Sequence, residues 1–511
     1  MLKGKTTIEL TDINTGEVAV FEDTNLITNA MSDLCQRTFK RGNTIHHTYS
    51  FYSNPISFNQ LFGGMLLFDT ALEENPNKYF PPTTANMVGH GSNITYTGTD
   101  LSLGSFNDVL YESSKKMRKF VWDFTAEQAN GTIASVCLTT QPGGIIGHGT
   151  TTPCEESSTP QRILSGYTRS YFNTYYDTSR AYFIPIYLSF ENDFVLYMAV
   201  NSIKAGKLQF VKIPLHSHKE DIFIDMPSPS SASGNGSDVV GHNYTEFNTT
   251  VVDLTSVVNT TGYVGCGQDG KYLYIAKNTA TNDMWSVNSE ITLVKINLDD
   301  LTYETFKVIN TTGEEIRMFS STDYYSFNTG YMFGVCDGYM FVKSDATEHK
   351  FYAINLSDNT IVRTIKTPNG NDLSTTSSRS TCFGMTVNNH ITFSKTRINM
   401  HSRQGATWEP IQIVNTNDFI AKTLNCPYWG IGSRDATVSN NTTNSDRAFP
   451  TDNPLYFGWC NLNNFSSSKT SDNFMIGSFP NVLMTINNLE TPVTKTSSQT
   501  MRITYTLTKE E

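Results

Sequence analysis

Two histidines one residue apart form the pair of side chains in this chain that most resembles a metal site. His216 and His218 flank Ser217, so in an extended segment both imidazoles point to the same side, and Glu220 and Asp221 follow. Zinc or nickel uses such imidazoles, but a zinc site needs at least a third protein ligand, and the sequence shows none at a fixed spacing. The sequence favours an exposed polar loop here, and we predict no bound metal and no cofactor.

Signatures of enzymatic nucleophiles are missing from the sequence. No Gly-x-Ser-x-Gly elbow occurs, and the Ser-x-Asp-x-Gly-x-x-Trp boxes of propeller sialidases do not occur either. Asp299-Asp300 and Asp358 lack the alternating oxygen ligands of calcium-binding loops, so we interpret them as turn residues. We therefore predict no catalytic residues and a protein that is not an enzyme. Glycan hydrolysis stays open, because it needs only two suitably spaced carboxylates.

Aromatic side chains offer a different chemistry, which is recognition. The chain is 12% aromatic, and most of these rings are expected to fill sheet cores. Tyr428, Trp429 and Trp459 instead flank a polar stretch at residues 433–453, which we expect to be a long surface loop, as is 227–238. Exposed rings stack on sugar faces and anchor protein interfaces. These three residues are therefore the candidates for receptor binding.

The elements that must position these side chains recur in the second half of the chain. Ile296–Asp300, Ile354–Asp358 and Val414–Asp418 each run from β-forming residues into an Asn/Asp turn, and their asparagines are 58 and 60 residues apart. Each phrase follows a hairpin signal, which lies at Asp269-Gly270, at Asp337-Gly338 or at Asn388-Asn389. Repeats of four short strands predict a β-propeller-like domain of five or six blades.

Composition excludes several classes of function. The formal net charge is −11 and only 17% of residues are charged, which argues against a nucleic-acid partner and fits antiparallel sheet with neutral polar faces. No stretch approaches the ~18 apolar residues that span a bilayer, so we expect no membrane insertion and no secretory signal. The eight cysteines are scattered and form no CxxC pair, which favours buried, reduced thiols in a protein made in a cytoplasm.

The two ends of the chain predict a second, separate domain. Thr6–Leu10 and Glu17–Glu22 alternate around a Gly-containing turn, which predicts a hairpin, and residues 25–35 read as a short helix. Residues 119–124 and 132–139 predict a strand pair, and 63–105 reads as irregular chain. Residues 498–508 alternate as a strand that would fray unless it is paired. We expect this strand to return to the N-terminal hairpin.

The predicted fold is therefore all-β and mainly antiparallel, with a β-rich base domain formed by both chain ends and an inserted β-propeller-like domain. The expected segments are 1–165 for an N-terminal β-rich attachment domain, 166–480 for the propeller, and 481–511 for the strands that return to the base.

Several phrases near the two ends resemble structural proteins of tailed bacteriophages that infect Firmicutes-type bacteria. The phrases are Lys5–Asp33, Gly63–Phe68, Val121–Phe124 with Asn130–Ile133 and Leu138-Thr139, and Met501–Leu507. The resemblance covers about the first 160 residues and the last 20 but not the repeated middle. It implies a tail-fibre, baseplate-peripheral or receptor-binding protein, usually a homo-oligomer and often a trimer, although the chain lacks the coiled-coil heptads and collagen-like repeats of many fibres.

We accordingly expect a virion structural protein, assembled in the host cytoplasm, that mediates attachment to the host cell surface. Its expected partners are other tail, baseplate or neck proteins of the virion and a host glycan or surface protein. Three alternatives remain: a capsid or neck fibre or decoration protein, a tail enzyme that depolymerises glycan, and a propeller scaffold unrelated to viruses.

Overall fold

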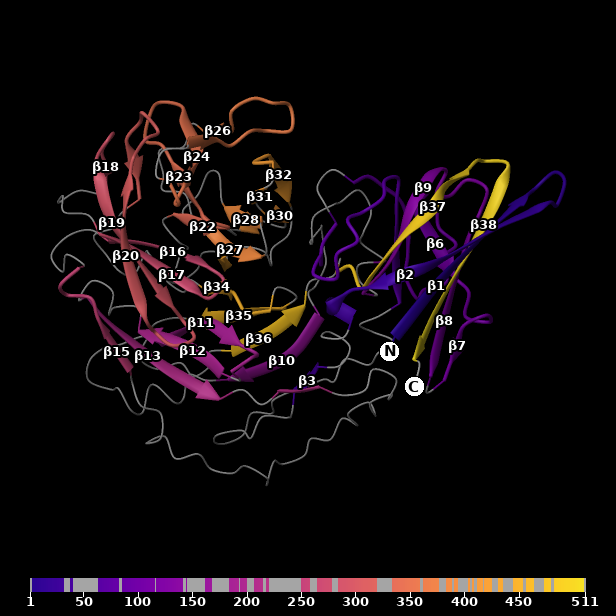
Figure 1. Cartoon of the computed structure of the whole chain (residues 1–511), viewed down its shortest axis with the longest axis horizontal. Helices are drawn as coiled ribbons and strands as arrows, with labels where there is room; N and C mark the ends of the chain where they lie inside the picture. Colours follow the sequence, from indigo (N-terminus) through magenta and orange to yellow (C-terminus); the bar gives the residue numbers. More distant parts are fainter. Residues whose placement is uncertain are drawn as a thin grey trace, which may run out of the picture.

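We describe the protein from a computed structural model of the 511-residue chain. The structure describes these residues, with the backbone alone for parts of some strands: 2–31, 37–39, 63–81, 85–114, 116–140, 144, 161–167, 183–192, 194–199, 206–214, 217–219, 250–257, 264–277, 284–318, 333–358, 362–375, 383–387, 390–393, 403–404, 407–408, 411–416, 418–424, 431–434, 444–453, 456–463, 473–478 and 482–509. Two bodies lie side by side, a ring of sheets and a barrel-like sheet that contains both labelled termini (Figure 1).

Nine of the described strands close into the barrel-like sheet of the base domain. In pairing order they are β38 (Gln499–Lys509), β1 (Leu2–Asp12), β2 (Val18–Ile27), β37 (Thr485–Lys495), β9 (Gly131–Thr139), β4 (Gly64–Phe68), β5 (Met87–Gly91), β6 (Leu103–Phe106) and β8 (Met117–Phe124), and β8 pairs again with β38. The short β7 (Glu112–Ser113) also pairs with β8. The pairs are antiparallel except β5–β6.

The expected return of the C-terminal strand to the N-terminal hairpin is confirmed. β1 and β38 pair along their whole length, from Leu2↔Lys509 to Asp12↔Gln499. Alternate residues of both strands point inward, so Ile8, Ile503 and Tyr505 are fully buried, and β8 adds Trp122 to the same core. The base domain thus requires segments from both halves of the chain.

Two local predictions for the base domain were wrong, and a third was confirmed only in part. Residues 63–105 are not irregular, because they contain β4, β5 and β6; the run Gly64–Phe68 is buried on both faces, and Gly91 lets its strand approach Trp122, where a Cβ would lie 2.8 Å from the ring. Strands β8 and β9 exist but do not pair with each other, since their partners are β38 and β37. Of the helix expected at 25–35, residues 25–27 belong to β2, residues 29–31 are helical, and 32–35 lie outside the described residues.

The ring contains four sheets of similar design among the described residues. The first is β11 (Phe183–Ser189), β12 (Phe194–Ala199), β13 (Lys207–Pro214) and β15 (Thr250–Asp253); the second is β16 (Val264–Asp269), β17 (Tyr272–Lys277), β19 (Glu290–Asn297) and β20 (Tyr303–Ile309); the third is β22 (Gly334–Cys336), β23 (Tyr339–Lys343), β24 (His349–Asn355) and β25 (Val362–Thr364); the fourth is β27 (Phe383–Val387), β28 (His390–Phe393), β31 (Ile411–Asn415) and β32 (Ala421–Leu424). The four strands expected per repeat are confirmed in these sheets.

A fifth sheet completes the ring and joins its two ends. Its order is β10 (Gln161–Tyr167), β36 (Asn473–Ser478), β35 (Tyr456–Asn463), β34 (Asn444–Phe449) and β33 (Ile431–Arg434). β10 precedes the first blade in sequence but pairs with the last one, so it fastens the ring and spans the expected boundary at residue 165. β33 and β34 lie within or beside 433–453, so the expectation of one long loop there was wrong.

Short strand pairs accompany the main sheets. β14 (Ser217–Lys219) pairs with β3 (Arg37–Phe39), and β26 (Ser374–Thr375) pairs with β24. The remaining pairs are β18 (Met284–Trp285) with β21 (Ile316–Arg317) and β29 (Arg403–Gln404) with β30 (Thr407–Trp408). The β3–β14 pair connects a segment early in the chain to the propeller.

The recurrent Asn-containing phrase forms the turn between the third and fourth strands of a blade. Asn297 Oδ1 accepts the Asp299 N–H at 3.1 Å, and Asn355 Oδ1 accepts the Ser357 N–H at 2.8 Å. Four residues after the asparagine, Leu301 and Phe419 have φ of 63° and 57°. A left-handed backbone conformation costs free energy in residues other than glycine. Here it accompanies burial of both apolar side chains, since Leu301 and Phe419 are buried. The Phe419 ring packs on Tyr339 of the neighbouring blade, 4.8 Å between centroids. The repeat therefore encodes contacts between blades.

The structure describes the side chains of three of the eight cysteines. Cys137, Cys266 and Cys336 are buried and form no disulfide, as expected for reduced thiols, and burial raises the pKa of Cys137 to about 12. Within the described ranges, no helix has the length and apolarity required to cross a bilayer.

Candidate functional site on the turn face of the propeller

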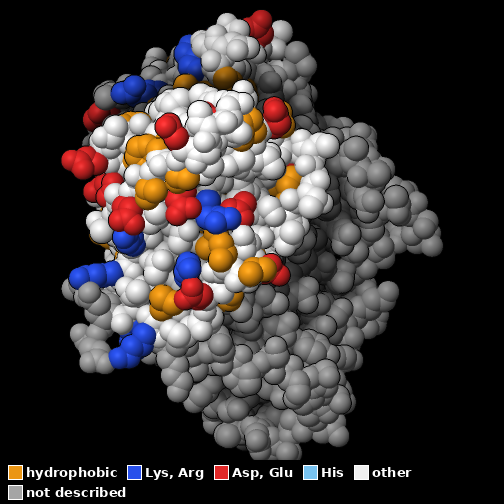
Figure 2. Space-filling view, turned by 90° about the vertical axis from the view of Figure 1, so that its right-hand side faces the viewer, with side chains coloured by type: hydrophobic (Ala, Val, Ile, Leu, Met, Phe, Trp, Pro, Cys, Tyr) orange, Lys and Arg blue, Asp and Glu red, His pale blue; other side chains and the backbone are white. Residues whose placement is uncertain are grey.

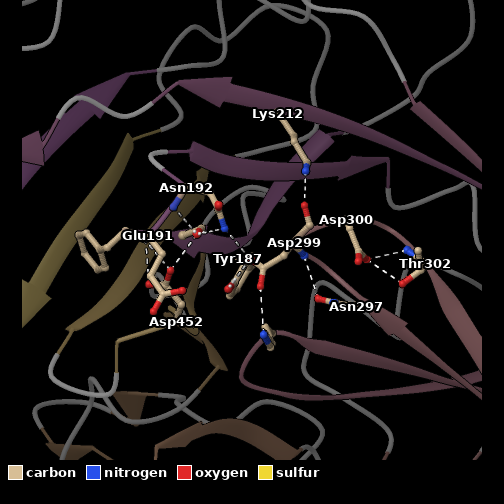
Figure 3. A network of polar contacts seen from close by, with 12 residues as sticks. Tyr187, Glu191, Asn192, Lys212, Asn297, Asp299, Asp300, Thr302 and Asp452 are labelled. Atoms are coloured by element: carbon tan, nitrogen blue, oxygen red, sulfur yellow. Dashed lines mark hydrogen bonds and ion pairs between the residues drawn. The ribbon is translucent and has the colours of Figure 1, made fainter.

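One face of the ring is formed by short turns that bring polar side chains of different blades together. Among the described residues, such turns follow the first strand of a blade at 190–192 and join the third to the fourth strand at 298–302. The polar cluster on the turn face is the best-defined candidate site among the described residues, and Figure 3 shows the part at the seam between the last, first and second blades.

Asp452 fastens the last blade to the first. Its Oδ1 accepts the Phe190 N–H at 2.8 Å, and its Oδ2 accepts the Ser189 hydroxyl at 2.7 Å and the Glu191 N–H at 2.9 Å. The neighbouring backbone pairs too, because Leu188 N–H donates to the Pro450 carbonyl and Asp452 N–H donates to the Leu188 carbonyl. One carboxylate thus organises the whole β11–β12 turn (Figure 3).

Asp299 makes the equivalent connection between the first and second blades. Its Oδ1 accepts the Tyr187 hydroxyl at 3.0 Å, and its Oδ2 pairs with Lys271 Nζ at 3.2 Å. The Lys212 ammonium donates to the Asp299 backbone carbonyl. Burial, with the charges of Asp452 and Asp299, raises the pKa of Tyr187 well above its usual value, so its hydroxyl remains a donor.

A second group of polar contacts joins four blades near the axis of the ring. Asp269, at the end of β16, accepts the Thr386 hydroxyl of β27 at 3.0 Å on Oδ1 and the Asp337 N–H at 3.1 Å on Oδ2. Asp337 Oδ2 in turn accepts the Thr416 hydroxyl at 3.0 Å. Gln268 Nε2 donates to the Ile186 carbonyl of the first blade at 2.9 Å. These bonds tie the inner strands of four successive blades to one another.

Burial raises the pKa of the Asp269 carboxyl to about 6, and the nearby Asp337 acts in the same direction, whereas its hydrogen bonds lower it. A carboxyl with such a pKa is a feature that general acids and bases share. Here both oxygens already accept hydrogen bonds from neighbouring blades, so a structural role accounts for the group. The chemistry that this face offers is hydrogen bonding, through the exposed Glu191, Asn192 and Asp300 at its rim.

The candidates drawn from the sequence are not among the described side chains. His216, Tyr428 and Trp429 fall outside the described residues. His218 lies in β14, opposite Thr38, and Trp459 lies in β35, opposite Ala448 and Met475, but the side chains of both are outside the described part. How these five side chains lie relative to one another is therefore outside the described part of the chain. No cluster of three or more His, Cys, Asp or Glu suited to a metal is found within the described ranges.

The sequence interpretation missed the role of the acidic residues at the seams. Asp299 and Asp300 are turn residues, as expected, with Thr302 donating to Asp300 through both its N–H and its hydroxyl. Asp299 also forms the contact between the first and second blades. The only signal of this in the sequence was its carboxyl group, since the equivalent positions of the other two Asn-containing phrases are Ser357 and Asn417. Asp452 had no signal, because its partners are more than 260 residues away in the chain.

Comparisons with known proteins add little to this geometry. No protein-family model and no curated protein matches the chain. Among solved structures, the β-propeller domain of the Trilobed protease from Pyrococcus furiosus matches with a TM-score of 0.22 and 9% identity, over 59% of this chain and 70% of that one.

Two enzymes are similar at the same level. A putative glycosidase from Bacteroides thetaiotaomicron matches with a TM-score of 0.27 and 9% identity, over 58% of this chain and 87% of that one. An oligogalacturonate lyase in complex with manganese matches with a TM-score of 0.23 and 9% identity, over 94% of this chain and 99% of that one. Because these scores are low, we base the propeller assignment on the strand pairing of this chain and infer no activity from these proteins.

Proposed function

We propose that the protein is a bacteriophage virion structural protein of the tail-fibre or baseplate-peripheral type, which mediates attachment to the host cell surface. In this proposal the barrel-like base binds other virion proteins, and the propeller contacts a host glycan or protein. The protein is assembled in the host cytoplasm and acts on the virion as a homo-oligomer, in which several weak contacts add up to firm adhesion.

The observation that carries the proposal is where the phage-like phrases fall in the fold. The phrases at 5–33, 63–68, 121–124, 130–133, 138–139 and 501–507 include residues of β1, β2, β4, β8, β9 and β38, all of which are base strands. The repeated blades, which have no such resemblance, lie between β9 and β37 in the chain. A base domain that resembles phage structural proteins, combined with a propeller that does not, fits a protein whose base binds a common virion partner and whose propeller binds a host-specific one.

The propeller supports a binding role in this proposal more readily than a catalytic one. Asp299 and Asp452, the acidic side chains at the seams, are occupied by contacts between blades. The exposed rim groups and the aromatic candidates Tyr428, Trp429 and Trp459 supply hydrogen bonds and ring faces, the two kinds of contact that sugar recognition uses.

Two measurements test the proposal. Immunogold labelling of purified virions should place the protein at the tail or baseplate. Label at the capsid or neck would favour the alternative of a capsid or neck fibre or decoration protein, and the absence of label on virions would overturn the proposal. Fluorescently labelled full-length protein should bind host cells, and the triple change of Tyr428, Trp429 and Trp459 to alanine should weaken that binding at least about tenfold.

The matched control is Tyr303→Ala, because Tyr303 is 43% exposed but lies on β20, away from the candidates in sequence. It should leave binding unchanged. Incubation with host cell-wall polysaccharide separates adhesion from catalysis: binding without release of reducing ends is expected, and release would assign the protein to the depolymerising enzymes.

A further inference from the structure

The β1–β2 hairpin of the base domain has an edge that no described strand covers. β2 pairs with β1 from Val18 to Asn25, but on its other side it pairs with β37 only through Leu26 and Ile27. From Asn487 onward β37 pairs with β9, with a shift of register between Asn488 and Val493. The closed sheet is therefore open along most of β2, and in Figure 1 the β1–β2 hairpin extends beyond the rest of the barrel.

The register tells which backbone groups face the open side. Thr28 N–H donates to the Met484 carbonyl of the segment leading into β37, so even-numbered residues of β2 direct their backbone groups to that side. Val18, Val20 and Glu22 therefore present N–H and C=O groups toward the open edge. The Thr24 N–H is taken by Asp23 Oδ1 at 2.7 Å, and Asp23 Oδ2 accepts the Glu490 N–H at 3.0 Å where the two strands separate. The open edge thus ends at Asp23.

The side chains along this edge are apolar and exposed. Val18 and Val20 are 56% and 55% exposed, and Ile13 at the turn is 55% exposed. Proteins usually protect an open edge with lysine, proline or a bulge, and β2 has no lysine or proline along these residues. Figure 2, which views the molecule from the base side, shows hydrophobic side chains interspersed with acidic and basic ones on this face.

The charge of the hairpin selects the kind of strand that fits. Residues 2–27 carry Lys3 and Lys5 against five acidic side chains, which leaves a net charge of −3; the acidic residues are Glu9, Asp12, Glu17, Glu22 and Asp23. Lys5 is already paired with Glu22 at 2.9 Å. A second copy would bring another acidic hairpin against the first, whereas a basic strand would be attracted.

We propose that the open edge of β2, from Val18 to Asp23, is a docking site for an extended segment of another virion protein, which adds to the sheet as a strand and carries lysine or arginine between β-branched residues. This inference rests on the proposed attachment of the base to the virion. Backbone hydrogen bonds to residues 18, 20 and 22 would supply affinity, and the alternation of basic and apolar side chains would supply specificity.

The test uses the full-length protein and a synthetic probe. The probe is a labelled nine-residue peptide in which lysine alternates with valine or threonine, and the control peptide has glutamate in place of lysine. Fluorescence anisotropy should show binding of the lysine peptide that weakens with salt, and at least about tenfold weaker binding of the glutamate peptide. Amide hydrogen exchange should slow at residues 18–22 when the lysine peptide binds.

Three variants identify the edge as the site. Val20→Pro removes an outward N–H while leaving the β1 pairing intact, and it should weaken peptide binding about tenfold. Val20→Thr keeps that N–H and should bind within about twofold of the wild type. Glu17→Lys changes only charge at the exposed turn, so it should lower affinity several-fold and reduce the salt dependence even if Val20→Pro does not fold.

Equal peptide binding by Val20→Pro and the wild type, or protection from exchange elsewhere, would overturn the inference. A wild-type dimer that dissociates in Val20→Pro would also overturn it, by assigning the edge to a second copy. Host-cell binding separates this inference from the proposed function. Val20→Pro should bind host cells as well as the wild type does. If the wild type does not bind host cells, the proposed function is wrong, whereas the inference about the β2 edge still depends on the peptide measurements.

Discussion

Replacing Asp269 with asparagine should remove a pH dependence of stability that originates at the axis of the propeller. Asp269 accepts hydrogen bonds from Thr386 and from the Asp337 N–H, so it connects three blades. Asparagine keeps nearly the same shape and can accept the Asp337 N–H through its oxygen, while its amide donates to the Thr386 hydroxyl, which can also act as an acceptor. It has no charge to desolvate.

The magnitude follows from the pKa of this carboxyl. Burial raises its pKa to about 6 from the ordinary value of 3.8, so between these pH values the folded protein binds more protons than the unfolded chain. The contribution of Asp269 to the free energy of unfolding therefore rises as pH falls, by about 1 kcal/mol from pH 7 to pH 5 and by about 3 kcal/mol in full. The ionised carboxylate is the costly form, and that cost is present at pH 7.

The assay is denaturant unfolding of full-length wild type and variant at pH 5, 6 and 7. Carboxyls with lowered pKa, such as Asp300 and Asp372, lose stabilisation only at lower pH, and they cancel when the two proteins are subtracted. Asp269→Ala is the second comparison, because it removes both contacts between blades and should cost about 1–3 kcal/mol at every pH.

The reasoning is refuted if the difference between wild type and Asp269→Asn is the same at pH 5 and pH 7. It is also refuted if that difference has the opposite sign, with the wild type losing stability relative to the variant as pH falls. Asp269→Ala matching Asp269→Asn in stability would show that the bonds between blades do not contribute.

Three further predictions concern the seam and the barrel. Asp452→Ala leaves the donors of Ser189, Phe190 and Glu191 without their acceptor and should lower the free energy of unfolding by about 2–4 kcal/mol, measured by denaturant titration; a change below about half a kcal/mol would argue against its role in closing the ring. Burial lowers the pKa of Lys495 to about 8, so above pH 8 the unfolded chain binds more protons than the folded protein. The stability of the wild type should therefore rise from pH 8 toward pH 10 in thermal unfolding scans, and Lys495→Met should lack this rise. Gly4→Ala would place a Cβ 2.4 Å from the Tyr505 Oη and should cost about 1–3 kcal/mol, and the added change Tyr505→Phe should recover part of it; equal stability of the single and double variants would contradict this explanation.

Local sequence patterns predicted the blades well because each blade is formed from neighbouring segments. The turns at Asp269-Gly270 and Asp337-Gly338 join adjacent strands, and Gly270 and Gly338 have φ of 50° and 78°, the conformation that favours glycine. The spacing of Asn297, Asn355 and Asn415 likewise reflects a turn repeated within single blades. Such signals need only contacts between residues close in the chain.

The base domain was predicted less accurately, because its partners are far apart in sequence. The run Gly64–Phe68 is apolar throughout, so period-two alternation could not identify it as a strand that is buried on both faces. β8 and β9 follow one another but pair with β38 and β37, since the barrel closes only when the two ends of the chain meet. Pattern could locate these strands but could not select their neighbours.

The sequence by itself determined the all-β composition, the repeated four-stranded unit and the alternation of the last strand, because each of these depends on side-chain period and turn residues. Only the tertiary structure decided that Asp299, Asp452 and Asp269 join blades and that β2 is left with an open edge. These features depend on which distant backbones approach one another, and that is settled by closure of the ring and of the barrel as wholes.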